Sequence, residues 1–322
     1  METRTLGTSG LRVSHVSLGT MRWGRDTDIH EARDQFNVYR DAGGLVLDTA
    51  DVYSDGAAEE IVGEFIRDYP EMLVSSKAGS VRGSESSNAS RSHLLTSLDN
   101  SLRRLRRTHI DIWHIHRWDG RTSLDETLNA LDHAVSSGKV RYVGISNFSG
   151  WQLALAGGIQ SQDRTRAPIT SAQVEYSLLE RGIEREVVPA SKELGMGIMA
   201  WSPLGRGVLT GKYRHNTPAD SRGASKHLAG FVAPYLGDRP SAIVDAVCVA
   251  AEALGHTPLD IALSWVLSRP QVATAIVGAR TASQLRAIMT GHNTILPPEI
   301  IKALDDVSTP HLGYPEFGWN QS

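Results

Sequence analysis

The sequence predicts a single (β/α)8 barrel (TIM barrel) over residues 1–322, because short apolar runs alternate with amphipathic segments almost from end to end. Repeated strand–helix units require a parallel sheet with right-handed connections, which leaves an open doubly wound sheet or a closed barrel. Eight units favour closure. The runs expected to be strands are Val16–Leu18, Leu45–Thr49, Met72–Ser76, Ile110–His116, Val140–Ser146, Ile169–Val174, Met196–Trp201 and Val272–Val277.

The segments between these runs have the spacing of helices, with apolar residues three and four positions apart. Ser90–Arg106 and Leu124–Val135 are two examples. Ser90 stands where an N-cap is expected, and Gly138 and Gly195 follow predicted helices in the position of C-capping glycines.

Two features depart from the repeating unit. Thr3–Leu6 and Leu11–Val13 flank a Gly-Thr-Ser-Gly turn, which predicts an N-terminal β-hairpin that caps the bottom of the barrel. The connection Pro203–Gly237, after the seventh strand, is too long for an ordinary loop. It carries one acid, Asp220, and the bases Arg206, Lys212, Arg214, Arg222 and Lys226. This excess fits either a solvated surface loop or a flap over an anionic ligand.

Composition excludes several classes of protein. The formal net charge of -3 gives no basic field for nucleic acid or anionic lipid. Cys248 is the only cysteine, so no internal disulfide is possible and a reducing compartment fits. The start Met1–Thr5 lacks a signal peptide's apolar core, and Asp245 and Glu252 interrupt the most apolar long stretch. We expect a cytoplasmic protein without a nucleic-acid or membrane partner.

The active site of such a barrel forms at the carboxyl ends of the strands. Asp48 and Tyr53 follow the second predicted strand, Lys77 the third, and His116 ends the fourth. Each alone is a weak signal, since an aspartate after a strand more often caps a helix. Together they suit proton transfer. A lysine charge lowers a tyrosine pKa from its reference near 10, a carboxylate holds the lysine charged, and an imidazole orients a carbonyl.

The fourth strand offers two histidines. Strand periodicity puts Ile112, His114 and His116 on one face. His116 lies at the strand end and is the predicted site residue, whereas His114 is expected one layer deeper, as a hydrogen-bonded core histidine.

The chain resembles the aldo-keto reductase superfamily, in the branch that includes bacterial reductases and potassium channel β subunits. The matching motifs cover nearly the whole chain: Gly7–Ser14, Leu18–Met21, Leu47–Tyr53, Ser76–Lys77, His116–Asp119, Gly138–Phe148, Gln173–Ser177, Trp201–Tyr213 and Val277–Thr281. The resemblance implies the same tetrad as the strand-end argument: Asp48, Tyr53, Lys77 and His116. No metal enters this chemistry.

The resemblance also implies an NADPH site. Ser146, Asn147 and Gln173 match residues that bind the nicotinamide carboxamide, and Trp201 matches an aromatic ring stacked on nicotinamide, with a plain core role as its alternative. The remaining predicted cofactor residues are Gly19, Thr20, Asp48, Ser202, Leu204, Gly207, Lys212, Gly278, Arg280 and Gln284.

NADPH is favoured over NADH because Gly278–Thr281 opens a helix, where free backbone N–H groups and Arg280 suit a phosphate. The chain has no Gly-x-Gly-x-x-Gly fingerprint after a strand, so Rossmann binding is not expected. It departs from the family at Ala287 and Ile288, where an acid and an asparagine commonly contact adenosine. NADH therefore stays possible as a cofactor.

Three functions fit the sequence: an NADPH-dependent reductase of aldehydes or ketones, an NADPH-binding regulatory subunit with little turnover, and a barrel enzyme of other chemistry such as a phosphate-metabolite isomerase. Trp23, Tyr53 and Trp118 are predicted to line the substrate pocket, with the tail aromatics Tyr314, Phe317 and Trp319. Such a wall suits apolar or aromatic carbonyls, and also sugars. The physiological substrate and the oligomeric state stay open.

Overall fold

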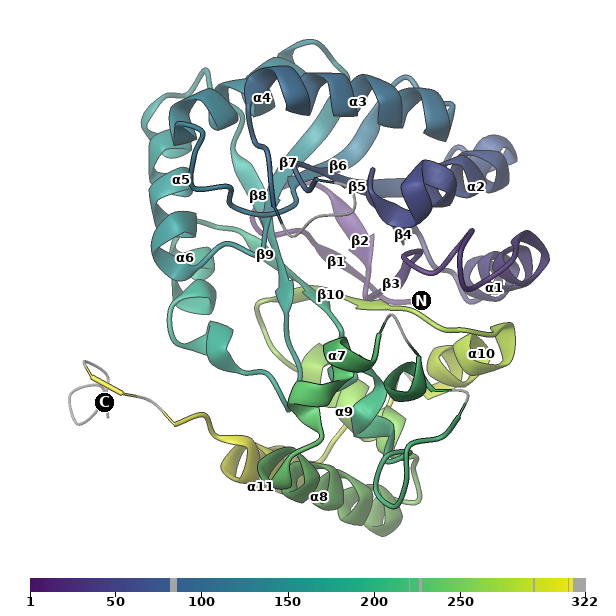
Figure 1. Ribbon diagram of the computed structural model, residues 1–322. Helices are drawn as coiled ribbons and strands as arrows, with labels where there is room; N and C mark the ends of the chain where they lie inside the picture. Colours follow the sequence, from purple (N-terminus) through teal and green to yellow (C-terminus); the bar gives the residue numbers. More distant parts are fainter. Residues whose placement is uncertain (82–85, 220, 226–227, 292, 312, 315–322) are drawn as a thin grey trace.

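The computed structural model describes residues 1–81, 86–219, 221–225, 228–291, 293–311 and 313–314. Eight parallel strands close into a barrel in the order β10-β3-β4-β5-β6-β7-β8-β9, which confirms the predicted (β/α)8 fold (Figure 1). The barrel strands are β3 (Val16–Gly19), β4 (Val46–Asp48), β5 (Leu73–Ala78), β6 (Ile110–Ile115), β7 (Val140–Ser146), β8 (Ile169–Glu175), β9 (Gly197–Trp201) and β10 (Val272–Val277).

Helices surround the barrel, and their buried apolar residues form one cluster with those of the strands (Figure 1). They are α1 (Ile29–Asp41), α2 (Ala57–Phe65), α3 (Arg91–Leu105), α4 (Leu124–Ser136), α5 (Gly150–Gln162), α6 (Val187–Glu193), α8 (Asp238–Leu254), α9 (Pro258–Leu267), α10 (Ala282–Gly291) and α11 (Pro298–Ser308). Short 3-10 turns add η1 (Tyr53–Gly56), η2 (Ile66–Asp68) and η3 (Gly182–Glu184).

The predicted helix boundaries hold. The Ser90 side chain accepts a hydrogen bond from the His93 amide before α3. Gly138 and Gly195 follow α4 and α6 with φ of +76° and +70°, the left-handed conformation that glycine adopts without strain.

The N-terminal hairpin caps the barrel as predicted. Strands β1 (Thr3–Thr5) and β2 (Arg12–Ser14) pair antiparallel. Leu6 and Val13 are fully buried in a cluster with Val46 and Ala273, which lie near the amino ends of β4 and β10. The hairpin therefore closes the end of the barrel opposite the strand ends that carry the predicted site.

The connection between β9 and α8 is long, as expected, and folds into short helices: η4 (Gly205–Thr210), η5 (Arg222–Ala224), α7 (Ala229–Val232) and η6 (Ala233–Tyr235). Arg206 donates to both oxygens of Glu175, at 2.8 and 2.5 Å, and its guanidinium lies 3.7 Å from the Phe231 ring centroid. Arg214 pairs with Asp245. Two of the five bases thus join the connection to neighbouring elements, Arg206 to the end of β8 and Arg214 to α8.

Lys226, Asp220 and the side chain of Arg222 lie outside the described residues. The flap interpretation stays a prediction. Among the described helices, none by itself is long and apolar enough to cross a membrane, although α8 and α9 pass that test as a pair bent by 102°.

We expect Leu6→Ala to lower the free energy of unfolding by about 2–5 kcal/mol, because it leaves a cavity between the hairpin and the barrel. Leu11→Ala is the matched control. Leu11 is only partly buried on the same hairpin, so its loss is expected to stay below about 1–2 kcal/mol. Chemical denaturation followed by tryptophan fluorescence measures both. Equal losses would show that the hairpin is not a plug.

Candidate active site

The four predicted proton-transfer residues converge at one rim of the barrel. Asp48 ends β4, Tyr53 opens η1 five residues later, Lys77 lies near the end of β5, and His116 directly follows β6. These three strands are neighbours in the sheet, with Lys77 paired in register with His114. Adjacent parallel strands therefore bring together side chains that lie up to 68 positions apart in the sequence.

Asp48 and Lys77 form a buried ion pair, with Nζ 2.6 Å from Oδ1 and side-chain exposures of 4% and 1%. The ammonium also donates to the Thr49 carbonyl at 2.7 Å. The second oxygen of Asp48 accepts from Ser75 Oγ and Gln173 Nε2, both at 2.8 Å. Burial lowers the pKa of Lys77, but Asp48 and Tyr53 together raise it above its ordinary value, so the lysine stays charged.

Tyr53 lies over this pair, its ring centroid 5.1 Å from Lys77 Nζ and 6.0 Å from the His116 ring. Burial raises the pKa of Tyr53, and the Lys77 charge opposes that change without reversing it. Lys77 thus lowers the Tyr53 pKa as predicted, but burial is the larger effect and the net pKa lies above its ordinary value. A phenol that keeps its proton at neutral pH suits a proton donor.

His116 is neutral at neutral pH. Burial, and then the Lys77 charge, lower its pKa to about 3. Its amide donates to the Ala78 carbonyl at 2.7 Å, and its carbonyl accepts from Asn147 Nδ2 at 3.0 Å. His114 lies deeper, fully buried, with Nε2 3.0 Å from Ser171 Oγ. The predicted placement of the two histidines is confirmed.

A tight turn presents Tyr53. Ser54 and Asp55 have φ of +48° and +61°, and Gly56 has φ of +93°. A Cβ on Gly56 would lie 2.8 Å from Arg104 Cδ, so a side chain there would displace the arginine. Arg104 in turn pairs with the fully buried Glu59 at 2.7 Å. Strained backbone of this kind persists where neighbouring contacts fix it.

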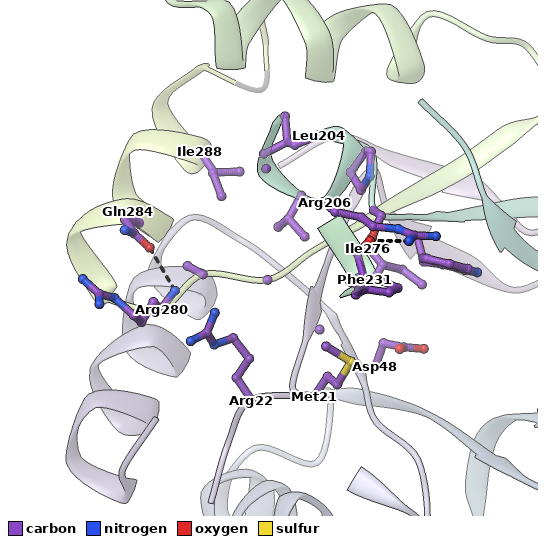
Figure 2. A pocket seen from close by; sticks show the side chains of 18 of the residues that line it. Met21, Arg22, Asp48, Leu204, Arg206, Phe231, Ile276, Arg280, Gln284 and Ile288 are labelled. Atoms are coloured by element: carbon purple, nitrogen blue, oxygen red, sulfur yellow. Dashed lines mark hydrogen bonds between the residues drawn. The ribbon is translucent and has the colours of Figure 1, made fainter. Parts of the chain in front are cut away.

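A cavity of about 630 Å³ opens beside the tetrad, lined by Asp48, Tyr53 and His116. Figure 2 shows it reaching from Asp48 to Arg280 and Gln284. Almost every predicted cofactor residue lines it: Gly19, Asp48, Ser146, Asn147, Gln173, Trp201, Ser202, Leu204, Gly207, Lys212, Gly278, Arg280 and Gln284.

A hydrogen-bond network joins the ends of β7, β8 and β9. Ser146 Oγ donates to the Gln173 carbonyl at 2.9 Å, Asn147 Nδ2 donates to Ser146 Oγ at 3.0 Å, and Trp201 Nε1 donates to Asn147 Oδ1 at 3.1 Å. Trp201 lines the cavity and stacks on Phe231 at 6.3 Å between ring centroids. A purely core role for Trp201 is therefore wrong.

Two predicted residues in the loop after β3 do not reach the cavity. Trp23 is fully buried, donates from Nε1 to Gln35 at 3.0 Å and packs on Phe65, so its prediction as a pocket residue is wrong. Thr20 is also fully buried, and its hydroxyl donates to the Asp48 carbonyl at 3.0 Å. It supports the strand that carries Asp48 instead of lining the cavity.

The predicted aromatic wall is only partly present. Trp118 is half-buried and packs edge-on against Phe148 and Trp151, at 5.3 and 5.5 Å between ring centroids, outside the cavity lining. Tyr314 is 83% exposed. Phe317 and Trp319 lie outside the described residues.

The structure adds lining residues that the sequence did not single out as site residues, among them Met21, Arg22, Arg117, Ile276 and Phe231. A usable signal existed for Met21, because it ends a quoted motif. No local signal marks Phe231, since it reaches the cavity from α7 in the long connection. Among the described residues, no cluster of three or more His, Cys, Asp or Glu side chains could hold a metal ion.

The chain is similar to known proteins over nearly its whole length. The model of the aldo/keto reductase family matches residues 15–309. A probable voltage-gated potassium channel subunit beta of Oryza sativa subsp. japonica is 34% identical over 317 residues, covering 95% of this chain and 96% of the relative. The uncharacterized oxidoreductase YrpG of Bacillus subtilis (strain 168) is 33% identical over 326 residues, covering 95% and 96%.

A third relative has a named substrate. The L-glyceraldehyde 3-phosphate reductase of Escherichia coli O157:H7 is 33% identical over 310 residues, covering 92% of this chain and 88% of the relative. A barrel enzyme of unrelated chemistry is not supported by these matches. The chain belongs to the aldo/keto reductase family, whose members are NAD(P)H-dependent oxidoreductases.

Proposed function

We propose that the protein reduces an aldehyde or ketone to an alcohol with NADPH as reductant and Tyr53 as general acid. The observation that carries the proposal is the position of Tyr53. Its ring lies 5.1 Å from the buried Lys77 ammonium and 6.0 Å from the His116 ring, at one end of the cavity.

The donors lining the cavity fit a nicotinamide dinucleotide. Amide and hydroxyl groups gather beside the tetrad, where Ser146, Asn147 and Gln173 would hold the uncharged carboxamide and Trp201 would stack on the ring. Arg280 lies toward the other end of the cavity (Figure 2), and Lys212 also lines it, so both would face phosphates. The cavity volume falls in the usual range for small-molecule and cofactor sites.

The reaction divides between the cofactor and the protein. A bound reduced nicotinamide supplies a hydride to the carbonyl carbon. Neutral His116 orients the carbonyl oxygen by a hydrogen bond, and the Tyr53 hydroxyl gives its proton to that oxygen as negative charge develops there. Lys77 stabilises the phenolate that this transfer leaves, and Asp48 keeps Lys77 charged and in place.

A regulatory subunit that binds NADPH and turns over slowly is the second candidate. The 34% identity to a probable potassium channel subunit beta favours it. Loss of NADPH absorbance with a panel of aldehydes and ketones separates the two, since rapid turnover with any of them supports the reductase.

We expect Tyr53→Phe to lower kcat by about 10²-fold or more while leaving NADPH binding nearly unchanged, because only the general acid is removed. Tyr142→Phe, on β7 and outside the cavity lining, is the matched control and is expected to keep wild-type turnover. Lys77→Met is expected to lower kcat similarly. Wild-type turnover in Tyr53→Phe would refute the proposed acid.

Substitutions of the two histidines should affect different measurements, kcat for His116 and thermal stability for His114. His116→Ala is expected to reduce kcat by about 10²-fold, the scale of a lost catalytic hydrogen bond, with little change in thermal stability. His114→Ala removes a buried side chain bonded to Ser171 and is expected mainly to lower the melting temperature. Steady-state kinetics and thermal unfolding of both variants test this. The reverse pattern would contradict the assignment.

The pH dependence follows from the two pKa shifts. His116 stays neutral because its pKa is lowered from 6.5 to about 3, and Tyr53 stays protonated because its pKa is raised above 10.0. Reductive kcat is therefore expected to be flat between about pH 5.5 and 9. A fall in kcat centred near pH 6.5 would show that His116 titrates normally.

A further inference from the structure

The start of α10, beside the cavity, has fewer available backbone donors than the sequence predicted. The Arg280 amide donates to Gln284 Oε1 at 3.0 Å, and the Gln284 amide donates to Thr281 Oγ1 at 3.3 Å. The Ala282 amide donates to the carboxylate of Glu31, which comes from α1. The prediction of free N–H groups at this helix start is therefore wrong at these three positions. An anion here therefore relies more on side chains than the sequence predicted.

Arg22 is the additional cationic side chain at this end of the cavity. It follows β3 and lines the same cavity as Arg280, with 15% of its side chain exposed. Its ion-pair partner, Asp26, is 3.9 Å away and lies closer to Arg25, at 2.9 Å. The Arg22 Nε is buried and makes no hydrogen bond to any described residue. A buried guanidinium N–H that has no hydrogen-bond partner in the described part of the chain and only a distant carboxylate favours an anionic ligand.

The two arginines act on one another. Burial lowers the pKa of Arg22, Asp26 raises it in part, and the charge of Arg280 lowers it further. Figure 2 shows the Arg22 side chain extending from the Met21 side of the cavity toward Arg280. Both guanidiniums keep their charge, because arginine does not lose its proton in proteins. Their repulsion is relieved when a group of two negative charges lies between them.

The position of Arg22 and Arg280 in the cavity indicates which anion they would bind. Gln284, Ala287 and Ile288 of α10 line the same cavity, and Asp48 marks the opposite end, at the tetrad (Figure 2). A dinucleotide with its nicotinamide at the tetrad would therefore place its adenosine half near α10. A phosphate ester on that half carries about -1.5 to -2 charges at neutral pH, which matches two guanidiniums.

We propose that Arg22 and Arg280 together bind the 2′-phosphate of NADPH, so that Arg22 is a specificity-determining residue for the phosphorylated dinucleotide. This inference rests on the proposed function, because it needs the dinucleotide in this cavity. Ala287 and Ile288 would give adenosine no polar side-chain contact. The phosphate contacts then carry most of the discrimination at this end of the site.

The test is equilibrium binding, measured by quenching of tryptophan fluorescence with NADPH and with NADH. Arg22→Met keeps the aliphatic stem and removes the charge. It is expected to weaken NADPH binding by about 10- to 100-fold and to change NADH binding by less than about 3-fold. Arg280→Met is expected to do the same. Arg214→Met, which removes an arginine paired with Asp245 outside the cavity lining, is the charge-matched control and is expected to change neither.

A conservative variant and competition experiments distinguish a phosphate contact from a purely structural role. Arg22→Lys keeps one positive charge and is expected to retain part of the preference for NADPH, which a purely structural role would not predict. Competition by adenosine 2′,5′-bisphosphate is expected to weaken in Arg22→Met, and competition by adenosine 5′-monophosphate to stay unchanged. An Arg22→Met protein with wild-type melting temperature and unchanged NADPH affinity would overturn the inference. Equal losses for NADPH and NADH would also overturn it.

The inference and the proposed reaction can fail separately. A wild-type protein that prefers NADPH but reduces no aldehyde or ketone would refute the proposed reaction. Loss of that preference in Arg22→Met would still support the role of Arg22. A wild-type protein that reduces carbonyls equally well with NADH and NADPH would overturn the inference and keep the reductase chemistry.

Discussion

The buried ion pair of Asp48 and Lys77 is the interaction on which the rest of the site depends. Burying two charges costs several kcal/mol per ion in real proteins, and such a pair is tolerated only when further hydrogen bonds satisfy both partners. Ser75 and Gln173 donate hydrogen bonds to the carboxylate, and the Thr49 carbonyl accepts one from the ammonium. The pair therefore links β4, β5 and β8 across the barrel, and it fixes a positive charge beneath Tyr53.

Burial keeps the groups beside this charge neutral, and the Lys77 charge adds to the effect of burial at His116 only. His116 takes its low pKa from burial and then from Lys77, so it is a hydrogen-bonding group and not a cation. The pKa of Tyr53 is raised because burial outweighs the same lysine, so the phenol holds the proton that the proposed reduction requires. Asp51, three residues beyond Asp48, has its pKa raised to about 7 by burial and by Glu59. Asp51 therefore carries only part of a negative charge at neutral pH.

How far the sequence predicted this site depended on where each residue lies. Side chains at strand ends, such as Asp48, Lys77 and His116, were predictable because period-two alternation and parallel pairing place them geometrically. Residues in loops were not: a shift of one or two positions after β3 buries Trp23 and exposes Arg22 to the cavity. Long-range contacts gave no local signal. Glu31 caps α10 from 251 positions away in the sequence, and Phe231 reaches Trp201 through a connection whose path no periodicity describes.

The cavity is electrostatically graded, which bears on how a dinucleotide would enter it. At the tetrad end the charges of Asp48 and Lys77 cancel within their ion pair, so an uncharged amide meets hydroxyl and amide partners. At the α10 end, Arg22 has only the weak partner Asp26 among the described residues, and its charge and that of Arg280 repel one another. Coulomb energy falls off only as the inverse of distance, so the two arginines attract the phosphates before close contact forms. The gradient therefore favours one orientation of the dinucleotide, with its nicotinamide directed toward Tyr53.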